Sequence, residues 1–382
     1  MHKLWLGFAQ SVTVIFAALY LLSFFRTVSV PSGGEAPKVN TATPVAPVLR
    51  SSVSGSYSAA AKTAMPSVVN IYTAKAIPSS RGWPFDPPSD YGEGAPMRAT
   101  SLGSGVIWRA DGYVVTNNHV VEGADEIAVV ASGRPPLSAR VVGTDPESDL
   151  AVLKVDATGL PAIQRGGNSL VDVGDVVLAI GNPFGVGQTV TQGIVSATGR
   201  NHLGINTFEN FIQTDAAINP GNSGGALVVT AGRLAGINTA IYTRSEGSIG
   251  IGFAIPVELV ASLADQLIAG GRVRRGYLGI QTQDLDAERA AQLGSAALPG
   301  VLVAAVEVDG PAQRGGLRPG YVIRSIGGLA VADAADLVAR TGNAKPGDTV
   351  VLQIERRGAA KALEITLGQR PTITQQRRSA PR

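Results

Sequence analysis

Three separate segments of this chain carry the residue types that a serine nucleophile needs. Ser223 lies in the glycine-rich segment Asn219–Leu227, His119 follows a short apolar run, and Asp149 opens another apolar run. A serine hydroxyl is a weak nucleophile until an adjacent imidazole takes its proton. A buried carboxylate must hold that imidazole in the right tautomer and stabilise its charged form. The combination predicts a hydrolase in which Ser223 attacks, His119 is the base and Asp149 orients His119.

The histidines narrow the choice of base. The chain has three of them, His2, His119 and His202. His2 stands at the extreme N-terminus and His202 lies in a loop-like stretch, whereas His119 directly follows the apolar strand pattern of residues 113–116. A lone histidine is more often a structural residue. Here the three candidate residue types occur together and in order, which favours catalysis.

The order of the three residues selects between two hydrolase architectures. Gly221, Ser223 and Gly225 match the nucleophile elbow of α/β-hydrolases, but that fold needs a histidine after the serine, and none follows Ser223. The order His119, Asp149, Ser223 is that of chymotrypsin-like double β-barrels. The glycines let backbone N–H groups turn inward, so the N–H groups of Gly221 and Ser223 are predicted to form the oxyanion hole.

Two other aspartates compete for the role of the acid. Asp145 lies in a turn signal before Pro146, where a turn-capping role is the simpler interpretation. Asp156 follows the apolar run 150–155 and is expected to be solvated. Asp149 immediately precedes that run, which would carry it into the interior.

Composition sets limits on the class of protein. Apolar residues make up 45% of the 382 residues and glycine is abundant at 47, which suits a turn-rich β protein with a sizeable core. The net charge of +3 is small and the arginines are scattered, so a nucleic-acid binder is not expected. Without cysteine there is no disulfide framework or Cys-ligated zinc site. We expect no metal and no cofactor.

The N-terminal segment predicts a membrane anchor. Residues Leu4 to Phe25 are uncharged, mostly apolar and long enough to span a bilayer. Trp5 and Phe24 stand near the two ends of the run, where aromatic side chains favour the interface. No small-residue cleavage site ends the run, so a retained anchor is favoured over a cleaved signal peptide. Lys3 favours a cytoplasmic N-terminus.

Beyond a Pro- and Ser-rich linker, short β-rich runs fall into two sets. Turns separate these runs from about residue 66 to residue 256, and the spacing is typical of a barrel or sandwich. Residues 75–99 are predicted to form a long loop. Residues 257–269 carry apolar side chains at helical spacing before two glycines and predict a helix. The site would lie in the cleft between the barrels.

Several blocks of the chain, taken in order, resemble the HtrA family of serine proteases, and the resemblance spans roughly residues 58–371. These blocks are Leu102–Ile107, Thr116–Val120, Ser148–Lys154, Ala179–Phe184, Gln213–Gly225 and Gly250–Pro256. With one anchor and one PDZ domain, the chain is most similar to the DegS type within that family. The resemblance implies a mainly β protein with an N-terminal transmembrane helix, a chymotrypsin-like protease domain and a PDZ domain. The expected segments are 1–26 (cytoplasmic tip and anchor), 27–56 (linker), 57–271 (protease), 272–371 (PDZ) and 372–382 (disordered tail).

The C-terminal part looks like a PDZ domain. Tyr277, Leu278, Gly279 and Ile280 match the loop whose backbone N–H groups receive the C-terminal carboxylate of a peptide, which then adds as a strand. Residues 333–341 are expected to form the helix lining this groove, with Leu337 a candidate pocket wall.

Two further residues carry roles only through the resemblance. Arg200 matches a family arginine that connects the PDZ domain, the sensor loop and the active site, although sequence physics alone would make it a solvated loop residue. Ile218 matches a position near the specificity pocket and would suit a small or medium aliphatic P1 side chain such as valine. Plain core packing is its simpler interpretation.

The resemblance also implies partners and a cellular place. It implies a single-pass protein of the bacterial inner membrane, a homotrimer whose protease and PDZ domains face the periplasm. The implied ligands are C-termini of misfolded outer-membrane proteins, and the implied substrate is a membrane-bound anti-sigma factor of the envelope stress response. Two alternatives remain: a general periplasmic quality-control protease or chaperone, and a PDZ adaptor on a degenerate protease scaffold.

Overall fold

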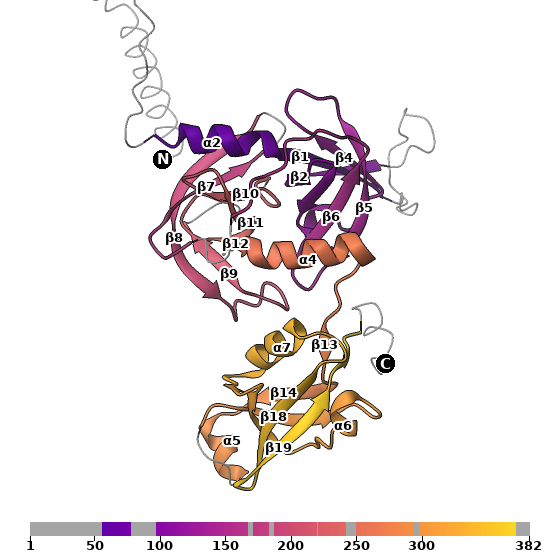
Figure 1. The fold of residues 1–382 in the computed structure, drawn as a ribbon, viewed down its shortest axis with the longest axis vertical. Helices are drawn as coiled ribbons and strands as arrows, with labels where there is room; N and C mark the ends of the chain where they lie inside the picture. The colour runs from indigo at the N-terminus through magenta and orange to yellow at the C-terminus, as the bar shows by residue number, and fades with distance from the viewer. Residues whose placement is uncertain are drawn as a thin grey trace, which may run out of the picture. The chain divides into compact units, whose positions relative to one another are not determined.

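The protein is mainly β, as predicted, with two closed barrels followed by a smaller C-terminal sheet (Figure 1). The computed structural model describes residues 56–77, 97–166, 171–182, 187–219, 221–241, 250–293 and 298–371. The predicted anchor Leu4 to Phe25, the linker up to residue 55 and the tail 372–382 lie outside these residues. Within the described ranges, no helix is both long and apolar enough to cross a membrane.

The first barrel carries the segments of the predicted histidine and aspartate. Its strands run in the order β1-β2-β3-β6-β5-β4, and each pairs antiparallel with its neighbours. The strands are β1 (Val68–Ile77), β2 (Met97–Arg109), β3 (Tyr113–Thr116), β4 (Glu126–Val130), β5 (Leu137–Asp145) and β6 (Leu150–Val155). Strand β6 is apolar except for Lys154 and is buried along most of its length, which explains why its sequence shows no polar alternation.

The second barrel carries the segment of the predicted serine. Its strand order is β10-β11-β12-β9-β8-β7, again antiparallel. The strands are β7 (Val176–Gly181), β8 (Thr189–Arg200), β9 (Phe211–Thr214), β10 (Ala226–Val229), β11 (Leu234–Ile241) and β12 (Gly252–Pro256).

The loop expected over residues 75–99 is shorter at both ends than the sequence indicates. Strand β1 continues to Ile77 and β2 begins at Met97, and Lys75 pairs with Ala99. The cross-strand hydrogen bonds of this ladder satisfy backbone groups that the Pro- and Gly-rich composition had placed in a loop.

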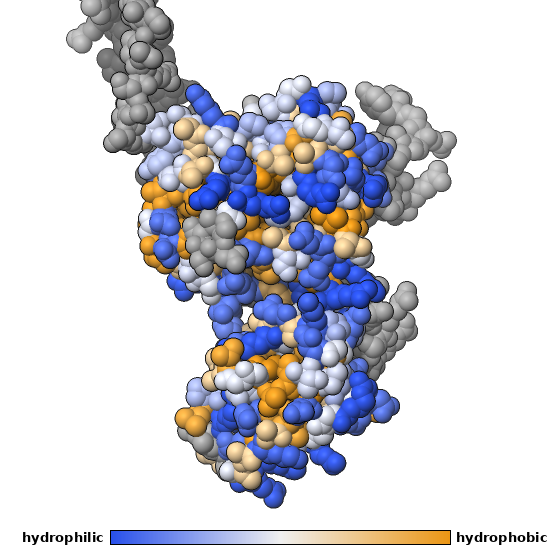
Figure 2. Space-filling view, viewed as in Figure 1, coloured by the Kyte–Doolittle hydropathy of each residue, from blue (hydrophilic) through white to orange (hydrophobic). Residues whose placement is uncertain are grey.

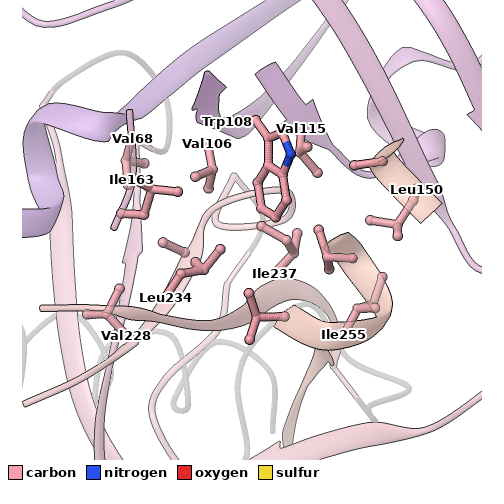
Figure 3. Close-up of a cluster of buried hydrophobic side chains, with 14 of the residues drawn as sticks. Val68, Val106, Trp108, Val115, Leu150, Ile163, Val228, Leu234, Ile237 and Ile255 are labelled. Atoms are coloured by element: carbon pink, nitrogen blue, oxygen red, sulfur yellow. The ribbon is translucent and has the colours of Figure 1, made fainter. Parts of the chain in front are cut away.

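An apolar core joins the two barrels (Figure 3). The indole ring of Trp108, only 2% exposed, lies among side chains from both barrels. They include Val68, Val106, Val115 and Leu150 from the first barrel, and Val228, Leu234, Ile237 and Ile255 from the second. Truncating so large a buried aromatic residue costs on the order of 3–5 kcal/mol. The shared core therefore holds the segments of the predicted active site together.

Helix α4 (Val257–Gly270) forms where the sequence predicts it. Its buried side chains Val260, Leu263 and Leu267 recur at helical spacing, and Gly271 ends the helix with a left-handed φ of 69°. The Gly271 N–H donates to the Leu267 carbonyl at 2.8 Å, which satisfies one of the free carbonyls of the last turn. The helix contacts strands of both barrels, β5 and β6 as well as β11 and β12 (Figure 1).

Shorter helices complete the N-terminal part of this domain. They are α2 (Ser58–Ala64), the 3-10 turn η1 (Met65–Ser67) and α3 (Asn118–Val121).

The C-terminal domain has its own sheet and its own core. Its main sheet runs in the order β14-β15-β16-β18-β19, with β17 paired to β16, and β13 pairs separately with β20. The strands are β13 (Gly276–Tyr277), β14 (Ile280–Asp284), β15 (Val301–Val306), β16 (Val322–Ile326), β17 (Leu329–Ala330), β18 (Thr349–Arg356), β19 (Ala359–Thr366) and β20 (Gly368–Gln369). Its helices are α5 (Ala287–Gln292), α6 (Pro311–Arg314) and α7 (Ala334–Asn343). Strand β14 is an edge strand, so it keeps one side open for pairing.

Candidate active site

His119 and Asp149 meet at the end of the first barrel. His119 stands in α3, just after β3, and its Nδ1 lies 2.7 Å from Asp149 Oδ2. The backbone N–H of His119 donates to Asp149 Oδ1 at 2.9 Å. The Asp149 side chain is 12% exposed and that of His119 is 48% exposed. A mostly buried carboxylate thus orients an imidazole whose other nitrogen can face a substrate.

The backbone at Asp149 is held in an unusual conformation. Its φ is 58°, the left-handed region, which aspartate adopts more readily than most residues with a Cβ. Its carbonyl accepts from the Asn118 N–H at 3.2 Å and from Asn117 Nδ2 at 3.0 Å. Neighbouring residues of α3 therefore fix the turn that aims the carboxylate at His119.

Thr239 is a member of the site that sequence reasoning missed. Its hydroxyl donates to Asp149 Oδ2 at 2.7 Å, and its carbonyl accepts from Ser223 Oγ at 3.3 Å. It lies on β11, where the pairing with β12 shifts register. The residue touches the predicted acid through its side chain and the predicted nucleophile through its backbone. No sequence motif marks it, because the contact depends on how the two barrels pack.

Ser223 lies beside this network, but its hydroxyl hydrogen-bonds elsewhere. Both residues are described, and the structure has no hydrogen bond between Ser223 and His119; the serine hydroxyl is directed to Thr239. Catalytic hydrogen bonds are often long or poorly aligned in a protein without substrate. Attack would therefore require the Ser223 hydroxyl to leave the Thr239 carbonyl for His119.

The loop around Ser223 is tied to β2. The Ser104 N–H donates to the Ser223 carbonyl at 2.8 Å, and Ser104 Oγ donates to the Gly221 carbonyl at 2.6 Å. Gly224 has a φ of 81°, and a Cβ there would lie 2.1 Å from the Ser104 carbonyl oxygen, so only glycine fits. The Gly221 φ of 95° likewise requires glycine. No described group accepts a hydrogen bond from the Gly221 or Ser223 N–H, so both donors suit an oxyanion.

The two residues singled out by resemblance lie in different surroundings. Ile218 is 1% exposed and belongs to the core of the second barrel, next to Gly252. Arg200 is exposed at the end of β8, where its Nε donates to Gln213 Oε1 at 3.0 Å. Neither geometry alone assigns them a role in specificity or regulation.

The C-terminal domain presents a groove beside the edge strand β14. A small cavity of about 40 Å³ is lined by the loop Tyr277–Ile280, by Leu337 of α7 and by Arg370, among others. Gly279 has a φ of 73°, and its carbonyl accepts from the Glu307 N–H at 2.9 Å. The space-filling view shows apolar surface in the area of β14 and α7 (Figure 2). An extended peptide with an apolar C-terminal residue fits this combination of open edge and apolar wall.

Residues of the C-terminal part contact loops of both barrels. Arg275 forms a bidentate ion pair with Asp145, with distances of 2.8 and 2.6 Å, and both side chains are only 6% exposed. The Arg275 guanidinium also lies 4.1 Å from the centre of the Phe208 ring. His202 Nε2 lies 2.9 Å from Asp333 Oδ1, at the start of α7. Asp145, interpreted from sequence as a turn-capping residue, is therefore also half of a buried ion pair.

Family models match two parts of the chain. Residues 103–237 match the trypsin-like peptidase domain, and residues 276–367 match the PDZ domain.

Known proteins resemble the chain over most of its length. A relative from Pseudomonas fulva (strain 12-X), described as "Probable periplasmic serine endoprotease DegP-like", is 44% identical over 81% of this chain and 70% of its own. One of the same description from Ectopseudomonas mendocina (strain ymp) is 49% identical over 73% of this chain and 58% of its own. The chain therefore spans 70% of the length of the first relative and 58% of the length of the second.

Solved structures are also similar to the chain over most of its length. The HtrA-type protease AlgW with a decapeptide is 48% identical, with a TM-score of 0.73, over 83% of this chain and 99% of its own. A serine endoprotease from Yersinia pestis is 40% identical, with a TM-score of 0.62, over 83% of this chain and 98% of its own.

Proposed function

The chain belongs to the HtrA family of serine endoproteases, and from that premise we propose that it is a membrane-anchored periplasmic protease of the envelope stress response. Its activity rises when the PDZ domain binds C-terminal peptides of misfolded outer-membrane proteins. The activated enzyme cleaves a membrane-bound anti-sigma factor. The relatives described as periplasmic and the peptide-bound AlgW structure support this proposal.

In the proposed mechanism Ser223 attacks the peptide carbonyl. His119 takes the serine proton and later gives it to the leaving amine, while Asp149 holds His119 in the required tautomer. The N–H groups of Gly221 and Ser223 bind the oxyanion. Thr239 supports Asp149, and its carbonyl holds the Ser223 hydroxyl until substrate arrives.

One observation carries the regulatory half of the proposal. The Asp145–Asp149 loop contributes both Asp149, which binds His119, and Asp145, which forms the buried ion pair with Arg275 at the entry to the PDZ domain. A change in how the PDZ domain is held would therefore act on the loop that positions the acid. A ligand shifts such an equilibrium only if it binds the two states with different affinity.

The remaining assignments extend the same proposal. Ile218 limits the P1 pocket to small or medium aliphatic side chains, and Arg200 takes part in communication between the PDZ domain and the active site. The active form is a homotrimer. The domain limits follow the segments expected from sequence, with residues 57–271 as the protease and 272–371 as the PDZ domain.

A peptide with a free C-terminal carboxylate is expected to raise turnover, and its amidated twin is expected to do so poorly. The amide lacks the anion that the N–H groups of Tyr277–Ile280 would bind. With a coupling free energy in the usual range, the free acid increases turnover by about 5–150-fold. The measurement is the rate of cleavage of a fluorogenic peptide with valine at P1, in the presence of a decapeptide made as the free acid or as the amide.

Three results would contradict this function. Equal turnover with the free acid, the amide and no peptide would exclude gating. Rapid degradation of unfolded casein without peptide would favour the quality-control protease, and peptide binding without any cleavage would favour the adaptor.

A chain ending at Gly271 separates the two modes of gating. Basal activity at least as high as that of the full chain indicates that the peptide relieves inhibition, and near-zero activity indicates positive activation.

The mature protein is expected to keep residues Leu4 to Phe25 as its anchor. The physical reason is the long apolar run without a small-residue cleavage site. N-terminal sequencing of the protein purified from membranes tests this, and a mature chain that begins near residue 27 or later would show a cleaved signal peptide instead.

A further inference from the structure

Arg370 lies where the peptide groove meets the protease domain. It directly follows β20, which pairs with β13, the strand that contains Tyr277. Its backbone N–H donates to the Arg275 carbonyl at 2.9 Å. Arg370 lines the same small cavity as the loop Tyr277–Ile280. An arginine therefore stands at the groove that contains the N–H groups expected to receive a peptide carboxylate.

The same guanidinium is bound to the loop that carries the catalytic acid. Arg370 Nε lies 2.8 Å from Glu147 Oε1, with side chains 19% and 13% exposed. Glu147 stands two residues before Asp149, and its carbonyl accepts from the Phe208 N–H at 2.9 Å. The Arg370 guanidinium also lies 5.5 Å from the centre of the Phe208 ring. Without a peptide, Glu147 is thus the carboxylate partner of Arg370.

The positive charge of Arg370 acts on Tyr277, the first residue of the carboxylate loop. Burial raises the pKa of Tyr277, and the Glu307 carboxylate raises it further, whereas the Arg370 guanidinium acts in the opposite direction. Within the described residues, Nε is the one side-chain nitrogen of Arg370 that donates a hydrogen bond. Because a guanidinium has five N–H donors in a planar fork, Arg370 can bind a second carboxylate.

We propose that Arg370 is a carboxylate receptor of the peptide groove, for which the C-terminal carboxylate of a bound peptide competes with Glu147. The proposal rests on the proposed peptide ligand and names the residue through which peptide binding affects the protease domain. When the peptide carboxylate binds the Arg370 guanidinium, the contact between Arg370 and Glu147 weakens. By linkage, the contact with Glu147 lowers peptide affinity by the same factor by which the peptide weakens that contact.

The proposal predicts opposite effects of two substitutions that break the same ion pair. Arg370→Gln removes the receptor and is expected to weaken binding of a free-acid peptide about tenfold, the low end for a hydrogen bond to a charged group, since Arg370 is partly exposed. Glu147→Gln removes the competitor and is expected to tighten binding of the same peptide severalfold. Arg370→Lys keeps the charge without the planar fork and is expected to fall between wild type and Arg370→Gln.

The probe is chosen from decapeptides that end in three apolar residues. The tightest binder is labelled with fluorescein at its N-terminus and made as the free acid and as the amide. Fluorescence anisotropy measures its Kd for the full-length protein in detergent. Neither substitution is expected to change the Kd of the amide. Arg340→Gln, which removes a positive charge from α7 and breaks the i,i+4 ion pair with Asp336, is the matched control and is expected to leave both Kd values unchanged.

The possible outcomes separate this proposal from the proposed function. If both substitutions change the free-acid Kd in the same direction, Arg370 is only a domain contact and the proposal fails. It also fails if Arg370→Gln weakens the amide as much as the free acid. If the wild-type protein binds no peptide of the pool, the peptide-binding function fails, and the role of Arg370 fails with it.

Discussion

Replacing Ser223 with alanine is expected to lower peptide-bond cleavage by about a millionfold, because the variant retains binding but has no nucleophile. The substitution removes one hydroxyl, whose hydrogen bond in the resting structure goes to the Thr239 carbonyl. The glycine turn and its ties to Ser104 use backbone groups of the loop and stay intact. Turnover of a fluorogenic peptide by the purified variant measures the loss.

The same variant is expected to bind C-terminal peptides as the wild-type chain does. The groove that would bind them belongs to the C-terminal domain, whose core is formed by its own strands and helices. Ser262→Ala, an exposed serine of α4, is the matched control and should keep full activity. Substantial cleavage by Ser223→Ala, at a level that contaminating protease does not explain, would overturn the assignment of the nucleophile.

The sequence predicts the parts of the site that carry their own local signal. His119 follows a short apolar strand and Ser223 lies in a run of glycines, so the residues beside each already indicate its place. Asp149 is the predicted acid because it precedes an apolar run, and that run is the buried strand β6. The signals for these three residues lie within a few residues of the positions they predict. Turn spacing alone indicates a barrel or sandwich, and the order of the three residues favours two barrels.

The sequence does not predict the parts that depend on contacts between distant segments. Thr239 binds Asp149 across a separation of 90 residues, and Asp145 binds Arg275 across 130. The first pair arises from the packing of the two barrels and the second from contact with the C-terminal domain, and neither leaves a periodic trace in the sequence.

Asp149→Asn is expected to lower turnover by about 10⁴-fold while leaving the protein folded, because an amide in that place favours the wrong tautomer of His119. Here the carboxylate accepts three hydrogen bonds, from the His119 N–H, from His119 Nδ1 and from the Thr239 hydroxyl. An asparagine side chain has one acceptor oxygen and a donor NH₂ group. It cannot serve all three partners. In one orientation the NH₂ group replaces Oδ2 and faces both His119 Nδ1 and the Thr239 hydroxyl, and in the other it replaces Oδ1 and faces the His119 backbone N–H.

Thr239→Val is the matched comparison, because it removes one of the three donors while keeping the shape of the side chain and the negative charge of Asp149. Losing one hydrogen bond of about 1 kcal/mol should cost roughly fivefold to tenfold in turnover. The kcat of both variants, with circular dichroism as a check of folding, separates two accounts of Asp149. If Asp149 orients His119 and stabilises its charged form, the asparagine variant loses orders of magnitude more activity than the valine variant. If it only anchors the turn between β5 and β6, the two losses would be similar, and the acid would have to be sought elsewhere.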